Sequence, residues 1–234
     1  MIRTFFHTIG QSLLSLFYPH RCAMCGCLLE DEHITLCAEC MRRLPRTEQA
    51  VLRGNQTEML FTDLPRFQRA ASFLFFDKGA DVQHLIHKIK FHEQPQIAYD
   101  LAAEAAADFL QAGFFDDIDY IVPIPLHPHR LRERGYNQSE WIARALSEAT
   151  GIPVDTTHVL RVRDNPQQAL KKAKDRAANV EGVFSVNHPE DFYHKHILIV
   201  DDLITTGSTV RACIKAMKVC RDARFSVFAL GKAR

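Results

Sequence analysis

The chain has 234 residues, and this length accommodates one domain of about 150 to 180 residues together with a small module. Its residues are 47% hydrophobic and 24% charged, which is ordinary for a soluble globular protein. The formal net charge of +1 excludes a global attraction to nucleic acids or membranes, so any site for a polyanion has to be local.

Residues 1–18 carry an apolar stripe at roughly helical spacing, formed by Phe5, Phe6, Ile9, Leu13, Leu16 and Phe17. We expect an amphipathic helix that packs on another part of the protein. A signal peptide is the alternative, but Gln11 and Ser12 interrupt the apolar run and no small-residue cleavage site follows before the cysteines. No stretch approaches the roughly 18 apolar residues of a membrane span. We expect a cytoplasmic protein without stable membrane insertion, with peripheral membrane contact as an alternative.

Five of the seven cysteines lie between residues 22 and 40. They include two C-x-x-C pairs, Cys22 with Cys25 and Cys37 with Cys40. Four thiolates are the tetrahedral set that a structural Zn²⁺ binds. The linker between the pairs is shorter than in most zinc ribbons, and Cys27 is a spare thiol that competes as a ligand. Reduced buried thiols and disulfides are the alternatives, and disulfides require an oxidising compartment.

The remaining chain alternates predicted strands and helices. Residues 46–66 lack periodicity, and we interpret them as a connector between an N-terminal module, residues 1–45, and a main domain, residues 67–234. In this domain we expect strands at 69–76, 118–124, 152–156, 182–186, 197–201 and 225–230, and helices near 82–89, 95–112 and 137–149. This alternation is typical of βαβ units and predicts an α/β fold with a mostly parallel sheet covered by helices on both faces.

A loop rich in proline and arginine follows the predicted strand at 118–124, where an open α/β sheet keeps its ligand crevice. It contains Pro123, Pro125, Pro128, Arg130, Arg132 and Arg134. The prolines predict a rigid loop without a regular helix. The arginines supply forked cations suited to phosphate oxygens, and a solvated basic loop is the alternative.

Residues 161–176 form a second basic stretch, with six basic residues against two acidic ones. Such a segment can fold over a bound ligand and exclude water from a reactive sugar. A solvated helix with charged faces is the alternative interpretation.

Residues 197–209 are the most informative part of the chain. Four apolar residues, which predict a buried strand, precede Asp201 and Asp202 at its expected end. A small-residue loop follows, with Thr205, Thr206, Gly207, Ser208 and Thr209, and then a helical pattern. Free N–H groups and the helix dipole make such a loop an anion site. Gly207 has no side chain, so a phosphate can approach the backbone closely. Because the acids accept hydrogen bonds from sugar hydroxyls, the predicted ligand is a ribose 5-phosphate. An ordinary turn with a Ser or Thr helix cap is the alternative.

This stretch resembles the phosphoribosyl-pyrophosphate (PRPP) binding motif of type I phosphoribosyltransferases. The resemblance implies that Asp201 and Asp202 are catalytic acids beside the ribose of Mg²⁺-bound PRPP, and that residues 205–209 bind its 5-phosphate. It implies a pyrophosphate site after the first core strand, formed by Pro125, Leu126, Arg130 and Arg134. It also implies a flexible loop that closes over PRPP and contains Lys171, Lys172 and Arg176.

Taken in order, several segments together resemble the competence protein F family, which joins a zinc finger to a phosphoribosyltransferase domain. They are the cysteine tetrad, Leu85–Phe91, Val122–Leu126, Arg134–Gln138, Asn165–Gln167, Arg176, Asn179 and the PRPP motif. The resemblance implies a role in natural transformation, with single-stranded DNA and the competence machinery as partners. By name it also implies amidophosphoribosyl transfer.

Two departures from better-known phosphoribosyltransferases narrow the acceptor. Thr205 stands where enzymes that salvage 6-oxopurines carry an acid, which disfavours hypoxanthine or guanine. The chain begins Met1-Ile2, so we expect neither the N-terminal glutaminase domain of the amidotransferases nor ammonia production from glutamine by that route. Two function classes remain open: a transferase with an unknown acceptor, and a non-catalytic DNA-handling adaptor that binds PRPP or a nucleotide phosphate.

Overall fold

The computed structural model describes residues 20–31, 34–76, 81–91, 94–164 and 182–233. The chain divides into two compact units, Met1–Leu44 and Pro45–Arg234. The predicted helix in residues 1–18 lies outside the described residues, as does the predicted flexible loop with Lys171, Lys172 and Arg176. In the described part of the chain, no helix is long and apolar enough to cross a membrane.

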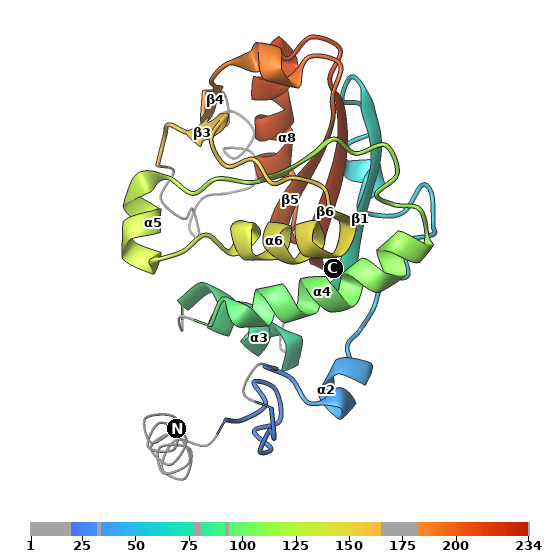
Figure 1. The fold of residues 1–234 in the computed structure, drawn as a ribbon, viewed down its shortest axis with the longest axis vertical. Helices are drawn as coiled ribbons and strands as arrows, with labels where there is room; N and C mark the ends of the chain where they lie inside the picture. Colours follow the sequence, from blue (N-terminus) through green and yellow to red (C-terminus); the bar gives the residue numbers. More distant parts are fainter. Residues whose placement is uncertain (1–19, 32–33, 77–80, 92–93, 165–181, 234) are drawn as a thin grey trace, which may run out of the picture. The chain divides into compact units, whose positions relative to one another are not determined.

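The second unit is built on a four-stranded sheet with the order β1-β6-β5-β2 (Figure 1). Its strands are β1 (Phe67–Phe76), β2 (Tyr120–Pro123), β5 (His196–Ile204) and β6 (Arg224–Ala233). All neighbouring strands pair in parallel, which confirms the predicted parallel sheet. Residues 196–200 of β5 are buried without alternation, as expected for a central strand covered on both faces.

Helices cover both faces of this sheet, as predicted. The longer helices of this unit are α3 (Asp81–Phe91), which packs on α4 (Gln96–Gln111), together with α6 (Gln138–Thr150) and α8 (Ser208–Ala216). Short 3-10 turns lie at Glu58–Leu60, Pro189–Phe192 and Met217–Val219. Ile199 of β5 packs in one cluster with Val210 and Ile214 of α8. Because strand side chains alternate, Leu198 and Val200 face the opposite side, and α6 contacts β2 and β5.

Two predicted strands differ from the structure. The segment 152–156 makes only an isolated bridge between Val154 and Ile121, because Pro153 lacks an N–H group and Asp155 turns the chain. The segment 182–186 contains β4 (Phe184–Val186), which pairs antiparallel with β3 (Val159–Arg161) in a separate two-stranded sheet. The strand β3 was not predicted. Alternating residues mark a strand but do not identify its partner.

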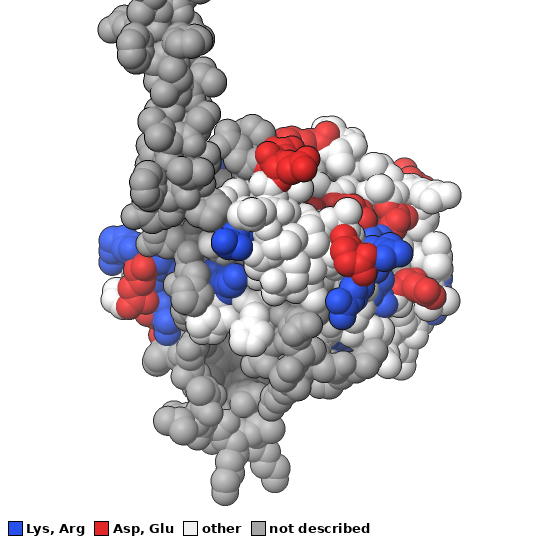
Figure 2. Space-filling view, turned by 90° about the horizontal axis from the view of Figure 1, so that it is seen from below, with Lys and Arg blue, Asp and Glu red and all other residues white. Residues whose placement is uncertain are grey.

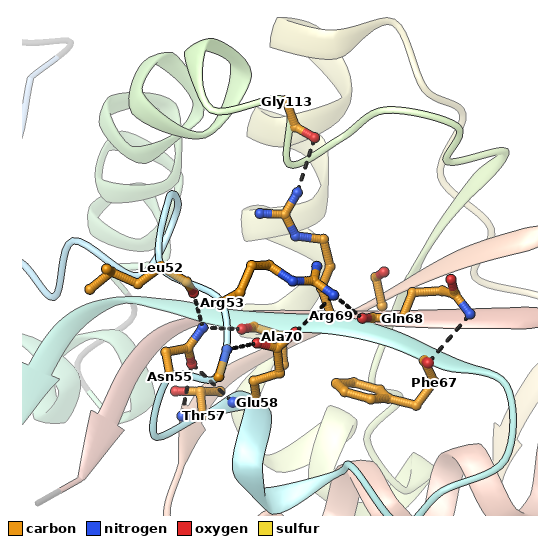
Figure 3. Close-up of polar contacts among 12 residues, drawn as sticks. Leu52, Arg53, Asn55, Thr57, Glu58, Phe67, Gln68, Arg69, Ala70 and Gly113 are labelled. Atoms are coloured by element: carbon orange, nitrogen blue, oxygen red, sulfur yellow. Dashed lines mark hydrogen bonds and ion pairs between the residues drawn. The ribbon is translucent and has the colours of Figure 1, made fainter.

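The segment 46–66 covers the outer edge of β1 (Figure 3). The Nδ2 of Asn55 donates to the Ala70 carbonyl at 2.8 Å, and the Nη2 of Arg53 donates to the Gln68 carbonyl at 2.9 Å. These bonds satisfy acceptors that an exposed edge strand would offer to another chain. The segment therefore ends the sheet at β1.

The turn after residue 154 is fastened by His158, which lies between two carboxylates. Its Nδ1 is 2.6 Å from Asp155 Oδ2, and its Nε2 is 2.9 Å from Asp191 Oδ2. The hydrogen bond to Asp191 raises the pKa of His158, and the Asp155 carboxylate adds to this effect although burial opposes it. The His158 ring thus links the 155–158 turn to the 3-10 turn before β5.

We predict that His158→Gln destabilises the protein by about 1 kcal/mol at pH 5.5, the range of a partly exposed ion pair, and by less at pH 8.5. A folded pKa above the unfolded one gives stability that is complete below the unfolded value of about 6.5 and is lost as the pH rises through the folded value. Urea unfolding at both pH values measures this. His84→Gln, at an exposed histidine of α3, is the control, and an equal loss at both pH values contradicts the prediction.

Candidate functional site

The two acids lie within β5 rather than after its end. The strand continues to Ile204, and Asp201 pairs in register with Ala229 of β6. On the other side, β2 stops at Pro123 opposite Val200. The acid pair, Asp201 and Asp202, therefore lies where β5 extends beyond its neighbour, next to the loop that follows β2.

The acid pair is held in a partly buried, charged environment. Asp202 is 8% exposed, and its Oδ2 lies 3.0 Å from the Nζ of Lys90 on α3. The N–H group of Asp202 donates to Asp201 Oδ1 at 2.9 Å. Burial and, after it, the Asp202 carboxylate together raise the pKa of Asp201 to about 7, although Lys90 and Arg161 oppose the shift. An acid with this pKa changes charge near neutral pH.

The 205–209 loop connects β5 to α8. Gly207 is the residue before the helix, and no side chain caps the N-terminus of α8. The alternative of an ordinary Ser or Thr cap is therefore not what the structure contains. The first turn of α8 leaves N–H groups for a ligand, in a helix of nine residues whose dipole favours an anion.

Gly207 has a second reason to be glycine. Its φ of +72° is left-handed, and a Cβ atom there would lie 2.9 Å from two ring carbons of Phe61. A Gly207→Val substitution would therefore not test the predicted role of Gly207, the close approach of a phosphate, by itself. That change would also displace Phe61, which is fully buried under the loop.

The connector braces this loop from a distant part of the sequence. The guanidinium of Arg211, in the first turn of α8, donates to Asp63 at 2.6 and 2.5 Å. The Nη1 of Arg211 also donates to the Leu60 carbonyl at 2.6 Å. The roles of Phe61, Asp63 and Arg211 could not be predicted from the sequence, because no local pattern marks a contact between segments about 150 residues apart.

The proline-rich loop after β2 contains a short helix, α5 (Pro128–Arg134), so the prediction of no helix is wrong. Pro128 occupies the first turn, where its missing N–H group is not needed, and Gly135 ends the helix at a φ of 78°. The residues Pro125 and Leu126 precede this helix in a segment without regular secondary structure. The prolines fix the entry to the helix rather than prevent it.

The predicted arginines of this loop do not share one environment. The Nε of Arg130 lies 3.6 Å from Asp164 Oδ1, and the Nδ1 of His129 lies 3.4 Å from Asp164 Oδ2. Arg134 is half-buried, and burial lowers its pKa although the nearby Asp202 carboxylate opposes this. The structure thus brings Arg134 toward the acid pair and holds Arg130 against Asp164.

Arg161 on β3 is a further cation of the site that the sequence analysis named only as the start of the second basic stretch. Burial lowers the pKa of Arg161, while the carboxylates of Asp201 and Asp164 raise it. Its buried Nε has no hydrogen-bond partner among the described residues. Its guanidinium lies over the Phe184 ring, at 5.7 Å from the centroid. The acid pair is thus surrounded by Lys90, Arg134 and Arg161.

The cysteine tetrad is assembled in the first unit. The Sγ atoms of Cys22, Cys25, Cys37 and Cys40 all lie within 4.8 Å of one another. The Cys25 and Cys37 sulfurs are 3.8 Å apart, as expected at two corners of a zinc tetrahedron with Zn–S bonds of about 2.3 Å. Burial alone would raise the pKa of Cys22, but N–H groups of Cys25, Cys37 and Met24 lower it to about 6. This donor set fits Zn²⁺.

The spare thiol Cys27 is exposed and lies outside this tetrad. Its hydrogen bond with Cys25 raises the pKa of Cys27 to about 12. The shift in the pKa of Cys27 is therefore opposite in direction to that of Cys22.

Comparisons with known proteins agree with these two units. Residues 13–51 match the double zinc ribbon domain family. Competence protein F of Haemophilus influenzae is 28% identical over 220 residues, which cover 92% of this chain and 86% of the relative. The DNA utilization protein YhgH of Salmonella typhi is 30% identical over 206 residues, which cover 83% of this chain and 89% of the relative.

A solved adenine phosphoribosyltransferase is 18% identical, with a TM-score of 0.41 over 60% of this chain and 72% of that chain. These sequence relatives confirm the expected resemblance to the competence protein F family. Because the match to a relative with 30% identity spans most of both proteins, this chain belongs to the family of competence protein F and DNA utilization protein YhgH.

Proposed function

We propose that the protein binds Mg²⁺-PRPP and transfers the phosphoribosyl group to an acceptor. One observation carries this proposal: the same short stretch of β5 and α8 presents two carboxylates and, directly after them, an uncapped helix N-terminus. Carboxylates suit ribose hydroxyls, and the helix N-terminus suits the 5-phosphate. Arg134 and Arg161 near the acid pair supply positive charge for the pyrophosphate.

In this proposal the chain's own groups position the ligand. The 205–209 loop fixes the 5-phosphate, and the connector keeps the loop in place through Asp63 and Arg211. Asp201 and Asp202 orient the ribose by accepting its hydroxyl protons in hydrogen bonds. Arg130 and Arg134, in the proline-rich loop after β2, stabilise the negative charge on the departing pyrophosphate.

The proposed metals are Mg²⁺, bound together with PRPP, and a structural Zn²⁺. The oxygen donors of Asp201 and Asp202 suit Mg²⁺, which keeps several waters and takes one or two carboxylates. When bound, Mg²⁺ offsets the charge of the pyrophosphate oxygens. The tetrad Cys22, Cys25, Cys37 and Cys40 suits Zn²⁺. We also propose the division into residues 1–45, 46–66 and 67–234, and a cytoplasmic location, where thiols stay reduced.

The test of transfer is pyrophosphate release from Mg²⁺-PRPP across a panel of amine and nucleobase acceptors, with and without single-stranded DNA. Release that depends on one acceptor supports the transferase. Binding of Mg²⁺-PRPP without release under any of these conditions supports the non-catalytic adaptor.

The adaptor is the second candidate because two relatives are named for DNA utilization and competence. Single-stranded DNA is its proposed ligand, with the competence machinery as partner. In Figure 2, basic and acidic side chains lie interspersed among the described residues on the face shown. The contact is therefore proposed for the local basic stretch 161–176, most of which lies outside the described residues.

We predict that Lys171→Ala, Lys172→Ala and Lys174→Ala together weaken single-stranded DNA binding and flatten its salt dependence. Each phosphate contact that is lost lowers the slope of log affinity against log salt by about 0.7, so three contacts give about 2. Fluorescence anisotropy between 50 and 300 mM salt measures the slope. The matched control removes three lysines from other parts of the sequence, Lys88, Lys215 and Lys218. An unchanged slope in the 171–174 variant excludes this stretch as the contact.

A further inference from the structure

Lys90 forms an ion pair that neither the sequence motif nor the family resemblance assigns. Its Nζ lies 3.0 Å from Asp202 Oδ2, with side-chain exposures of 22% for Lys90 and 11% for Asp202. Among the described residues, this is the one ion pair that either member of the acid pair makes. A carboxylate as buried as Asp202 needs a nearby cation, and the Lys90 ammonium is in contact with it.

The position of Lys90 is fixed by packing and by the neighbouring loop. Leu85 and Ile89 of α3 are fully buried, so the helix is anchored in the core. The hydroxyl of Tyr136 donates to the Ile89 carbonyl, one residue before Lys90. Because Tyr136 follows α5, this bond joins the end of α3 to the same loop that carries Arg134. These contacts fix the backbone position from which the Lys90 side chain reaches Asp202.

An ammonium group and a divalent cation compete for one carboxylate oxygen. Both take the lone pairs of Oδ2 at contact distance, and their like charges repel each other across a few ångströms in a partly buried site. Lys90 consequently has to leave Asp202 Oδ2 before that oxygen can bind a divalent cation.

We propose that Lys90 is the internal counter-cation of Asp202 and sets the divalent-cation concentration at which the acid pair becomes available to ligand. This inference rests on the proposed function, because the acid pair is there the site at which a divalent cation accompanies PRPP. Lys90 would thereby determine how much divalent cation the site requires. The Lys90 ammonium offsets the charge of Asp202. It leaves Asp202 only when binding of the divalent cation is more favourable than the Lys90–Asp202 ion pair.

The test uses Mn²⁺ alone as the probe, titrated into the full-length protein and followed by electron paramagnetic resonance of the free ion. Lys90→Met should bind Mn²⁺ at least about threefold more tightly than the wild type, because the competing ammonium is gone. Lys90→Arg keeps the charge and should stay within the wild-type range. Lys88→Met makes the same charge change elsewhere on α3 and should leave the affinity unchanged. Unchanged or weaker Mn²⁺ binding by folded Lys90→Met overturns the proposal.

Two further arms separate this inference from the proposed function. Adding Asp202→Asn to Lys90→Met should abolish the gain in Mn²⁺ affinity, and persistence of the gain overturns the assignment to Asp202. With PRPP present, Lys90→Met should reach half-maximal PRPP binding at a lower Mg²⁺ concentration than the wild type. If no variant binds PRPP but the Mn²⁺ gain is found, the proposed function fails while the role of Lys90 stands. Circular dichroism of each variant establishes that it is folded.

Discussion

Replacing Cys22 with serine is expected to remove Zn²⁺ from the first unit and to unfold that unit, while the unit from Pro45 to Arg234 stays folded. The described part of the first unit, residues 20–31 and 34–44, has one helix, α2 (Ala38–Arg42), and few buried apolar side chains besides its cysteines: Ala23, Leu36 and Leu44. Metal binding in so small a module supplies its folding free energy, about 10–16 kcal/mol for structural zinc in peptides. The second unit has its own core around β5 and β6.

Metal analysis measures the first effect, with about one zinc per chain in the wild type and almost none in Cys22→Ser. Limited proteolysis measures the second, because cleavage should become fast before residue 45 and stay slow after it. Cys27→Ser is the matched control, since Cys27 is a neighbouring thiol outside the tetrad and its loss should leave the zinc in place. Wild-type protein without zinc and with all thiols titrating freely contradicts the assignment.

The part of the site that could be predicted from the sequence is the part that is contiguous in it. Three parts of the site follow one another along the chain: the acid pair, the 205–209 loop and the start of α8. Their spacing in the sequence was therefore enough to predict that they lie close together. The four cysteines were likewise paired by local C-x-x-C spacing. When the residues of a site are contiguous in the sequence, their order and spacing are enough to predict which of them lie together.

The missed residues reach the same site from distant segments. Lys90, Phe61 and Arg161 come from α3, the connector and β3, and each was visible in the sequence only as a member of a helix face, a loop or a charged run. Their roles arise from burial and charge at the end of β5. Composition and periodicity do not specify which cation meets which carboxylate.

The errors in secondary structure have the same origin. Pro128 was taken to prevent a helix, but at the first helical position proline stabilises one. The residues 184–186 have a strand pattern that the antiparallel partner β3 satisfies outside the main sheet. The extent of β5 was also underestimated, because two acids suggested a strand end although the pairing with β6 continues to Ile204.

The double variant Asp201→Asn with Asp202→Asn is expected to lose Mg²⁺-PRPP binding by at least about 100-fold, because two charge-assisted contacts of about 1.5–3 kcal/mol each are removed. Both carboxylates lie within β5, in the part that extends beyond β2 and leads into the 205–209 loop, and Lys90 lies beside Asp202. Isothermal titration calorimetry with Mg²⁺-PRPP measures the loss. Wild-type protein without a response at millimolar ligand, or a double variant that responds as strongly as the wild type, would falsify the PRPP assignment.

Stability measurements show whether this loss is one of binding or of folding. Burial raises the pKa of Asp201 to about 7, whereas an unfolded aspartate titrates near 3.9. The folded protein therefore holds a proton that the unfolded chain releases, so stability falls as the pH rises from about 4 to 7, and the full cost is present above pH 7. Asp201→Asn removes this cost. Without ligand or added metal, its melting temperature should equal or exceed that of the wild type at pH 8, and the difference should shrink at pH 5. A variant that binds no PRPP yet gains stability at pH 8 identifies Asp201 as a residue kept for the ligand at the expense of the fold.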